Sequence, residues 1–453
     1  MLGVTLSRWT MSYFAVALLS LLAGELALTL GYGYPLPVLN SPATLAVVHV
    51  LTLGWLSLLL AGALQQFVPV LVARPLAHPR LSLPILLLLI IGTAGLITGF
   101  RALSTGAGGA WFALAACALS AGFLLLLWNL LHTLWRARPW ALPARFVLAG
   151  LTGLTLAVLL GLSFLGVLAG ATGAPWTVAL LGYGVPLHVI AALGGWLTLT
   201  AIGVSYRLLA MFMLAPEPNR RGSHAALWLG ATALLLAVIG GATLVVAGLD
   251  AHKLLVIAGM LGVPALLLYL RDMRALYRRR QRRVLELNAS MSVGALLSLA
   301  AGATLLLLLA AVGGDWHAWL PAIVYLLLFG WLSGLGLAQL YKIVAFLTWL
   351  EVFGPQLGRG PTPRVQDLVD EPHARGWFRL YFLTAWLAAT ALLLDWPAAF
   401  RMAAATQLLA TLAIVDQLWR TRRLCALRQH PLPVRPALLC VRQTPATPTE
   451  NHP

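Results

Sequence analysis

Residues 44–72 read TLAVVHVLTLGWLSLLLAGALQQFVPVLV and contain no aspartate, glutamate, lysine or arginine. A helix needs roughly 20 consecutive apolar residues to cross the hydrocarbon core of a bilayer, so this stretch is long enough to span a membrane. Of the 453 residues in the chain, 60% are hydrophobic and 9% are charged, and the mean hydropathy is +0.89. Soluble domains carry about 25% charged residues. The composition therefore excludes a water-soluble globular protein.

Twelve stretches of this kind predict an all-α, polytopic membrane protein whose membrane domain covers residues 1–424. Element boundaries read from sequence are uncertain by a few residues. We place the helices at about 11–32, 44–72, 82–101, 109–134, 145–170, 177–206, 224–248, 253–271, 287–312, 318–350, 378–394 and 398–419. The segment at about 351–377 is predicted to be a surface loop.

Basic residues alternate between the loops. They gather after the even-numbered helices, as in the seven arginines from Arg271 to Arg283. Lysine and arginine are retained on the cytoplasmic side of a membrane, so we expect both termini in the cytoplasm and the protein in a bacterial-type inner (plasma) membrane. This topology, with the attraction of basic loops to anionic lipids, accounts for the net charge of +17, so no nucleic-acid partner is implied. The Pro/Thr-rich tail, 425–453, is predicted to be cytoplasmic and disordered.

A short motif recurs in the second, sixth and tenth helices. The copies are Gly54-Trp-Leu-Ser57, Gly195-Trp-Leu-Thr198 and Gly330-Trp-Leu-Ser333, and they lie 141 and 135 residues apart. Internal repeats reveal architecture, and these intervals predict three pseudo-repeats of four helices, at roughly 1–140, 141–283 and 284–424. Small residues let helix backbones approach closely, so we expect the motif glycines to pack around a central axis.

A polar residue follows each motif glycine at the same interval. Gln66, Arg207 and Lys342 all come twelve residues after their glycine, near the predicted cytoplasmic end of the helix. Long polar side chains at that depth reach the lipid headgroups. We therefore expect these three to snorkel.

Two histidines lie at membrane depth, where a polar side chain is costly and points to function. His49 in the second helix and His188 in the sixth both fall in the outer third of the membrane. They are candidate axial ligands of one haem, or each is a ligand of a separate centre. In the tenth helix the position equivalent to His49 is Tyr325.

Three more residues are candidates for supporting such a site. Glu25 lies in the first helix at the depth of His49, where it is placed to accept a hydrogen bond from the imidazole, to relay protons, or to remain a neutral carboxyl group bonded to backbone or water. His252 and His317 lie at outer helix ends. Each either overhangs a cofactor or is simply solvated.

The topology and two segments resemble the haem-copper oxidase subunit I superfamily, which includes terminal oxidases and the membrane subunit of nitric oxide reductase. The segments are residues 49–57 with their continuation at 65–71, and residues 341–347. A weaker resemblance is to NnrS-type membrane proteins. The resemblance implies a b-type haem, a role in respiratory electron transfer or nitrogen-oxide metabolism, and other respiratory subunits as partners. It matches His49 to a low-spin haem ligand and His188 to a copper-binding histidine.

The same resemblance implies an incomplete copper site. The family has a histidine pair at the outer end of helix 7 and a His-x-His in helix 10, where this chain offers His252 and Tyr325. Copper is therefore not expected to bind, His188 being the sole candidate ligand, and no enzymatic reaction is assigned. Two alternatives remain open: a proton-coupled transporter in which Glu25 lines the path, and a non-catalytic assembly subunit of a respiratory complex.

Overall fold

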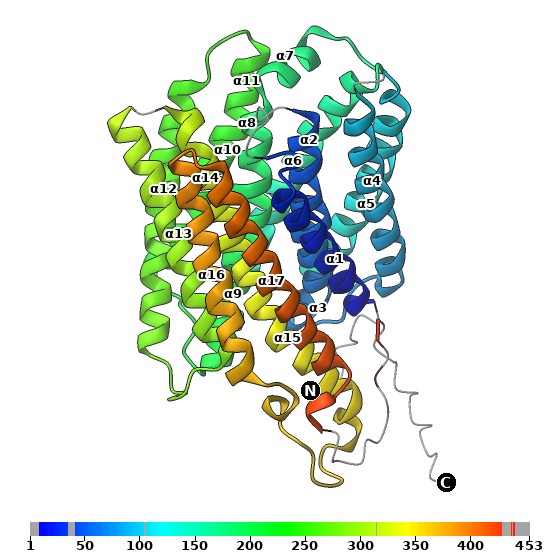
Figure 1. Cartoon of the computed structure of the whole chain (residues 1–453), viewed down its shortest axis with the longest axis vertical. Helices are drawn as coiled ribbons and strands as arrows, with labels where there is room; N and C mark the ends of the chain where they lie inside the picture. The colour runs from blue at the N-terminus through cyan, green and yellow to red at the C-terminus, as the bar shows by residue number, and fades with distance from the viewer. Residues whose placement is uncertain are drawn as a thin grey trace.

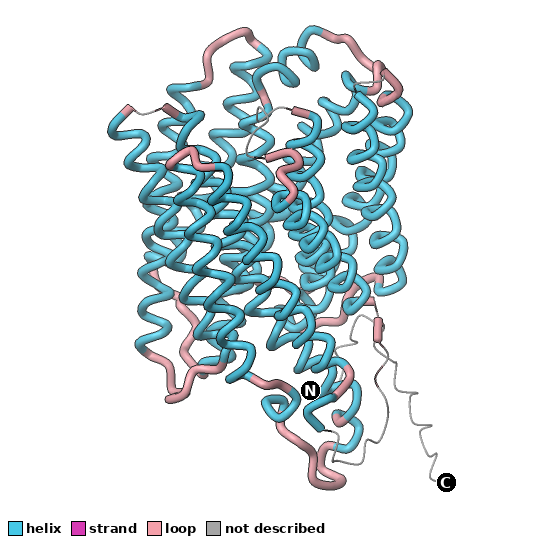
Figure 2. The backbone as a smooth tube through the Cα atoms, in the orientation of Figure 1, coloured by secondary structure: helices cyan, strands magenta, loops and turns pink. Residues whose placement is uncertain are grey.

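The structure is a computed structural model, and it describes residues 9–34, 41–103, 106–313, 315–427, 436 and 438–439. Within that part of the chain every regular element is a helix (Figure 2). Twelve helices are long and apolar enough to cross a membrane, which confirms the predicted all-α, polytopic class. The apolar side chains on their outer faces place the protein in contact with the lipid bilayer.

Several spans are built from consecutive α-helical and π-helical segments. In chain order the twelve spans are α1 (Thr10–Thr29); α2 (Pro42–His49), η1 (Val50–Ser57) and α3 (Leu58–Val72); η2 (Pro79–Leu81) and α4 (Ser82–Ala102); α5 (Gly109–Trp135); α6 (Leu142–Leu168); α8 (Val185–Val189), η4 (Ile190–Leu199) and α9 (Thr200–Met213); α10 (Arg221–Leu235), η5 (Leu236–Gly240) and α11 (Gly241–Val246); α12 (His252–Arg278); α13 (Leu287–Val312); α14 (Trp316–Tyr325), η6 (Leu326–Ser333) and α15 (Gly334–Val352); α16 (Glu371–Leu393); and α17 (Pro397–Arg422).

Four predicted boundaries were wrong by seven residues or more. The sixth span ends at Met213 rather than at 206, and the eighth ends at Arg278 rather than at 271, because each helix continues past the arginine at which its apolar stretch stops. The sixth span begins at Val185 rather than at 177, because a separate short helix, α7 (Pro175–Tyr183), ends at Gly184. Pro186 then occupies the first turn of α8, where its missing N–H costs little. The predicted loop at 351–377 is shorter than expected, since α16 already begins at Glu371, capped by the side chain of Asp370.

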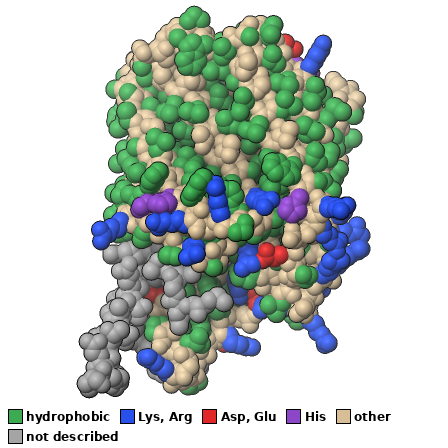
Figure 3. All heavy atoms as spheres, turned by 180° about the vertical axis from the view of Figure 1, so that it is seen from behind, with side chains coloured by type: hydrophobic (Ala, Val, Ile, Leu, Met, Phe, Trp, Pro, Cys, Tyr) green, Lys and Arg blue, Asp and Glu red, His purple; other side chains and the backbone are tan. Residues whose placement is uncertain are grey.

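The two ends of the helical bundle differ from each other in charge. Helix α1 begins and α17 ends at the same end of the molecule (Figure 1). Lysine and arginine side chains gather toward that end, while hydrophobic side chains cover much of the rest of the visible face (Figure 3). We call this the basic end and the other the opposite end. The assignment of the basic end to the cytoplasm stays a prediction from the positive-inside rule.

Helix packing follows one scheme in each group of four spans. The first span packs against the π-helical segment of the second, as α1 does with η1, α6 with η4 and α13 with η6. The third packs against the fourth, and α17 packs against α1 and closes the ring. This common scheme is what three repeats would produce, although the repeat itself stays a prediction.

The three Gly-Trp motifs lie inside three of these π-helical segments, and their tryptophans are buried. Trp55 Nε1 donates to Ser333 Oγ at 2.8 Å, and Trp196 Nε1 donates to Ser57 Oγ at 3.0 Å. Trp331 Nε1 has no acceptor among the described residues. The motif tryptophans therefore link one group of helices to another at the centre of the bundle.

The motif glycines do not pack around a central axis as predicted. A Cβ added at Gly54 would lie 2.8 Å from Ser20 Oγ in α1, and one added at Gly330 would lie 2.6 Å from Ser298 in α13. Gly195 lies against Gly153 in α6, where an added Cβ would lie 2.9 Å from the Gly153 Cα. Each glycine thus faces the first helix of its own group, because the centre is filled by the neighbouring tryptophans.

The polar residues that follow the motif have protein partners. Lys342 forms an ion pair with Glu286 at 2.7 Å, and its side chain is only 16% exposed. Arg207 pairs with Glu217, and Gln66 Oε1 accepts a hydrogen bond from Thr10 at 3.5 Å. The predicted snorkelling is therefore wrong for Lys342, because an acidic residue from a neighbouring segment neutralises it.

The helical bundle ends in a small satellite core at the basic end. A 3₁₀ turn, η9 (Cys425–Leu427), follows α17, and Leu427 is buried together with Val352, Phe353 and Leu368. The first residues of the predicted tail are therefore packed. Except for residues 436 and 438–439, the rest of the tail lies outside the described residues.

Ser57→Ala is expected to lower the stability of the bundle by about 1 kcal/mol, the size of a hydrogen bond between membrane helices. The change removes the acceptor of Trp196 Nε1 at a buried position. The thermal unfolding midpoint of detergent-purified protein measures the effect. Thr198→Ala, at the equivalent place in the second motif, removes no Trp hydrogen bond and serves as the control. Equal midpoints for the two variants would contradict the assignment.

Candidate functional site

His49 is held at the junction between α2 and η1. Its Nδ1 lies 2.7 Å from the carbonyl oxygen of Leu45, one turn earlier, so Nδ1–H donates to that carbonyl. Its ring lies 5.3 Å from the ring of Phe100, centroid to centroid. The imidazole is half-buried. Its Nε2 has no hydrogen-bond partner among the described side chains.

His188 is held in a similar way, two residues before η4. Its Nδ1 donates to the carbonyl oxygen of Ala157 in α6 at 3.0 Å, and its ring lies 5.6 Å from that of Phe164. Gly161 leaves room for the ring, since a Cβ there would lie 3.3 Å from His188 Cε1. The imidazole is half-buried, and its Nε2, like that of His49, has no hydrogen-bond partner among the described side chains.

The two histidines lie at the same depth. Ser57 and Trp196, which share a hydrogen bond, each come eight residues after their histidine on spans that run in the same direction. At 1.5 Å per residue, both imidazoles lie roughly 12 Å farther toward the opposite end. The geometry therefore brings His49 and His188 together in one sector of the bundle.

Aromatic side chains surround this sector. Phe100 contacts His49 and also Phe112 of α5, with ring centroids 5.5 Å apart, while Phe164 of α6 covers His188. Such apolar, aromatic surroundings with a few placed polar groups are typical of cofactor sites. Spans two to six thus contribute the residues around the two imidazoles.

The two histidines fit the requirements of haem ligands. A ligating histidine donates its second ring N–H to a carbonyl or carboxylate, which fixes the tautomer and aims the other nitrogen at the iron. Both imidazoles have this arrangement through backbone carbonyls. Within the described part of the chain, no three His, Cys, Asp or Glu side chains form a metal-binding group.

Glu25 does not bond to His49, contrary to one of the predicted arrangements. Its Oε1 instead accepts hydrogen bonds from Thr411 at 3.0 Å and from Gln407 Nε2 at 3.4 Å, both on α17. Tyr325 also belongs to this cluster, because its hydroxyl donates to Gln407 Oε1 at 3.0 Å. The partners lie more than 380 residues from Glu25, so no local pattern could have found them.

His252 and His317 lie at exposed helix starts, at the opposite end of the molecule. The backbone N–H of each is capped by the side chain of the aspartate two residues before, Asp250 and Asp315, at 2.9 Å. Neither imidazole contacts His49 or His188 in the described structure. The arrangement favours solvated histidines over residues that cover a cofactor.

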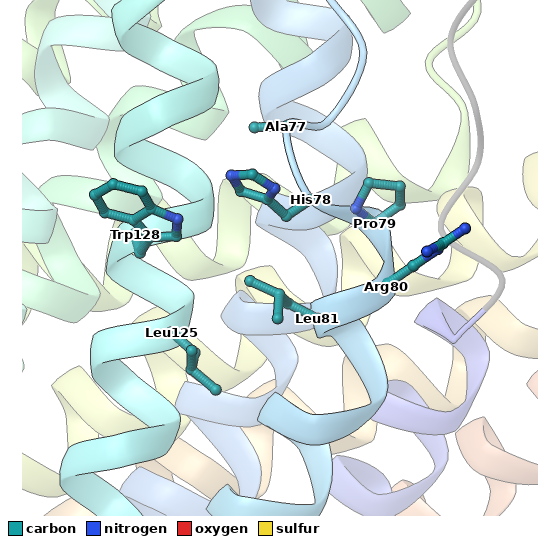
Figure 4. A pocket seen from close by; sticks show the side chains of 7 residues that line it. All are labelled: Ala77, His78, Pro79, Arg80, Leu81, Leu125 and Trp128. Atoms are coloured by element: carbon teal, nitrogen blue, oxygen red, sulfur yellow. The ribbon is translucent and has the colours of Figure 1, made fainter.

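A second pair of histidines lies at the basic end. His78 Nε2 and His132 Nδ1 are 2.9 Å apart, and the ring of His78 is stacked beside Trp128. A recess of about 550 Å³ opens here, lined by His78, Trp128 and Arg80 among others (Figure 4). The sequence did not connect these histidines, which are 54 residues apart. The recess is separate from the sector around His49.

Fold and side chains together define a polytopic integral membrane protein with about twelve spans. Comparison of the sequence with protein-family models and with curated proteins gave no match. The functional argument therefore depends on the geometry of this chain.

Proposed function

We propose that this membrane protein holds one b-type haem between His49 and His188 and transfers electrons within the membrane. The observation that carries the proposal is the pair of half-buried imidazoles at one depth, each with Nδ1 tied to a backbone carbonyl and Nε2 left over. Both imidazoles would serve one haem iron rather than two separate centres, because they lie at one depth on two spans joined by the hydrogen bond between Trp196 and Ser57.

A bound haem supplies a reversible one-electron couple. The residues of the chain orient and insulate it. The carbonyls of Leu45 and Ala157 fix the two imidazole tautomers. Phe100, Phe112 and Phe164 make the surroundings of the two imidazoles apolar, and a low dielectric around a haem is one of the means by which a protein sets its potential.

The proposal includes a divergent relationship to the haem-copper oxidase subunit I superfamily. The common packing scheme of the three helix groups supports it, as do the segments quoted above. It does not extend to reduction of oxygen or nitric oxide by the family mechanism, because that mechanism needs further histidines beside His188. The histidine that follows the seventh span, His252, is exposed at the start of α12.

A reduced-minus-oxidised visible spectrum and a pyridine haemochrome assay test the proposal. We expect one b-type haem per chain in protein purified from cells supplied with haem. His49→Ala and His188→Ala should each abolish the low-spin signal, because either change leaves the iron with one protein ligand at most. A colourless wild-type protein would refute the proposal.

The variants also distinguish one haem from two separate centres. If each histidine served its own centre, each variant would keep the undisturbed signal of the other. His252→Ala is the matched control, since it removes an exposed imidazole and should leave the spectrum unchanged. Loss of signal in this control would point to a general folding defect.

A further inference from the structure

Glu25 is a carboxyl group in the interior of the bundle with one oxygen unused. The residue is 2% exposed, and its Oε1 accepts hydrogen bonds from Thr411 and Gln407. Its Oε2 is buried and has no partner among the described residues. A polar atom left unsatisfied at this depth costs free energy, so it marks a place where a ligand is missing or a proton binds.

Other buried acidic residues of the described structure have cationic partners. Glu351 pairs with Arg422 at 2.5 Å, and Glu286 pairs with Lys342 at 2.7 Å. Asp272 lies 4.0 Å from Arg271 and accepts two hydrogen bonds. No ion pair is formed by Glu25 within the described chain. An isolated buried carboxylate is far more costly than a neutral carboxyl group, and a proton is the simplest cation to remove that cost.

Polar groups continue from Glu25 toward the opposite end. Gln407 accepts a hydrogen bond from Tyr325. The rings of Tyr325 and Tyr34 each contact that of Phe400 edge-on, with centroids 5.5 and 5.6 Å from it. The hydroxyl of Tyr34 is buried without a partner in the described part of the chain. Because burial also raises the pKa of Tyr34, this hydroxyl keeps its proton and can donate it to a hydrogen bond.

Arg401 lies at the end of these polar groups that is farthest from Glu25, which we call the mouth. Its guanidinium group lies against Gly31, and its Nε is buried without a partner in the described structure. Gly31 is six residues beyond Glu25 on one chain segment, and Arg401 is six residues before Gln407 on the other. Both spacings correspond to roughly 9 Å of helix, so the mouth lies about that far above the carboxyl group.

Toward the basic end the route is closed by helix packing. Gly24 lies against the side chain of Leu51, and Gly54 lies so close to α1 that an added Cβ would be 2.8 Å from Ser20 Oγ. Just before Glu25, and for one further turn toward the basic end, α1 and η1 are therefore in close contact. The titratable or charged groups around Glu25 are those on the open side together with Tyr381 of α16: Tyr34, Tyr325, Tyr381 and Arg401.

We propose that Glu25 is a proton-binding site reached from the opposite end of the bundle along Tyr34, Tyr325 and Gln407. A metal cation fits less well, because it needs several oxygen ligands, whereas Glu25 Oε1 and Gln407 Oε1 already accept hydrogen bonds. The site shares no residue with the two haem-ligand candidates. It therefore stands or fails independently of the proposed haem.

Dicyclohexylcarbodiimide, which modifies protonated carboxyl groups in apolar surroundings, tests the site in the full-length protein in detergent. We expect one adduct per chain, mapped to Glu25 by mass spectrometry, with a rate that falls as the pH rises. Glu25→Gln should remove the adduct. Excess sodium chloride in place of choline chloride should not protect. No adduct at Glu25, or protection by sodium, would overturn the proposal, and protection would indicate a metal-cation site.

Infrared spectroscopy tests the route. The carbonyl band of a protonated carboxyl group, absent in Glu25→Gln, should shift when the protein is transferred to deuterated water. Tyr34→Phe should slow this shift several-fold, because it removes the hydroxyl nearest the mouth. Tyr32→Phe is the matched control, since Tyr32 is 42% exposed. Equal rates in the two variants would rule out a route along Tyr34.

Discussion

Gly153→Ala is expected to destabilise the protein by about 2 kcal/mol. An added Cβ would lie 2.6 Å from three backbone atoms of Gly195 and Trp196, and a backbone cannot turn aside as a side chain can. Overpacking a well-packed interior typically costs about 1–3 kcal/mol. Alanine recovers about 1 kcal/mol through its greater helix propensity, which is less than the rigid contact costs when the two helices have to separate.

The control for this variant lies on the facing segment. Gly194→Ala adds the same methyl group next to Gly195, but no atom lies within 4 Å of the new Cβ. Its unfolding midpoint in detergent should equal or slightly exceed that of the wild type, whereas Gly153→Ala should show a clearly lower midpoint. Similar midpoints for both variants would mean that α6 and η4 are not in backbone contact.

Arg422→Met is expected to cost about 3–5 kcal/mol, the loss observed when one partner of a buried ion pair is removed. Arg422 Nη2 lies 2.5 Å from Glu351 Oε2, and the two side chains are 4% and 2% exposed. Nη1 also donates to Thr348 at 3.1 Å. Removing the guanidinium group leaves the carboxylate of Glu351 buried where α15 meets α17.

Two companion variants show whether the loss comes from the buried charge of Glu351. Adding Glu351→Gln to Arg422→Met should recover much of the stability, because the buried charge is then gone. Arg420→Met removes an exposed pair with Asp416, 2.6 Å long, and should cost less than 1 kcal/mol. Chemical unfolding in mixed micelles measures all three. A double variant no better than Arg422→Met would contradict the explanation.

The membrane class of the fold could be predicted because apolar stretches of spanning length leave few alternatives. The fourth span was expected at 109–134 and occupies Gly109–Trp135. The start of the sixth span was missed because it depends on a break at Gly184 that hydropathy does not register. Periodicity shows where a helix is apolar, but not where two short helices abut.

The candidate sites were predictable only in part. Hydropathy identified His49, His188 and Glu25 as polar residues at membrane depth. The spacing to the motif gave the approximate level of the two histidines, and the distance to the outer end of the first helix gave that of Glu25. The partners of Glu25 could not be predicted, since Gln407 and Thr411 come from the last span. For the same reason the sequence missed the contact between Gly153 and Gly195, which arises only when two helices meet face to face.

The π-helical segments have a consequence for how these positions are aimed. In an α-helix each added residue turns everything that follows by about 100°, and a π-helical turn accommodates one residue more than an α-helical turn. The π-helical turns at 50–57 and 326–333 therefore set the direction in which the outer half of each span faces, separately from the direction of its tryptophan. As a result, His49 faces Phe100 while Tyr325 faces Gln407. Deleting one residue from such a turn would rotate the outer half of the span by about 100° relative to its tryptophan.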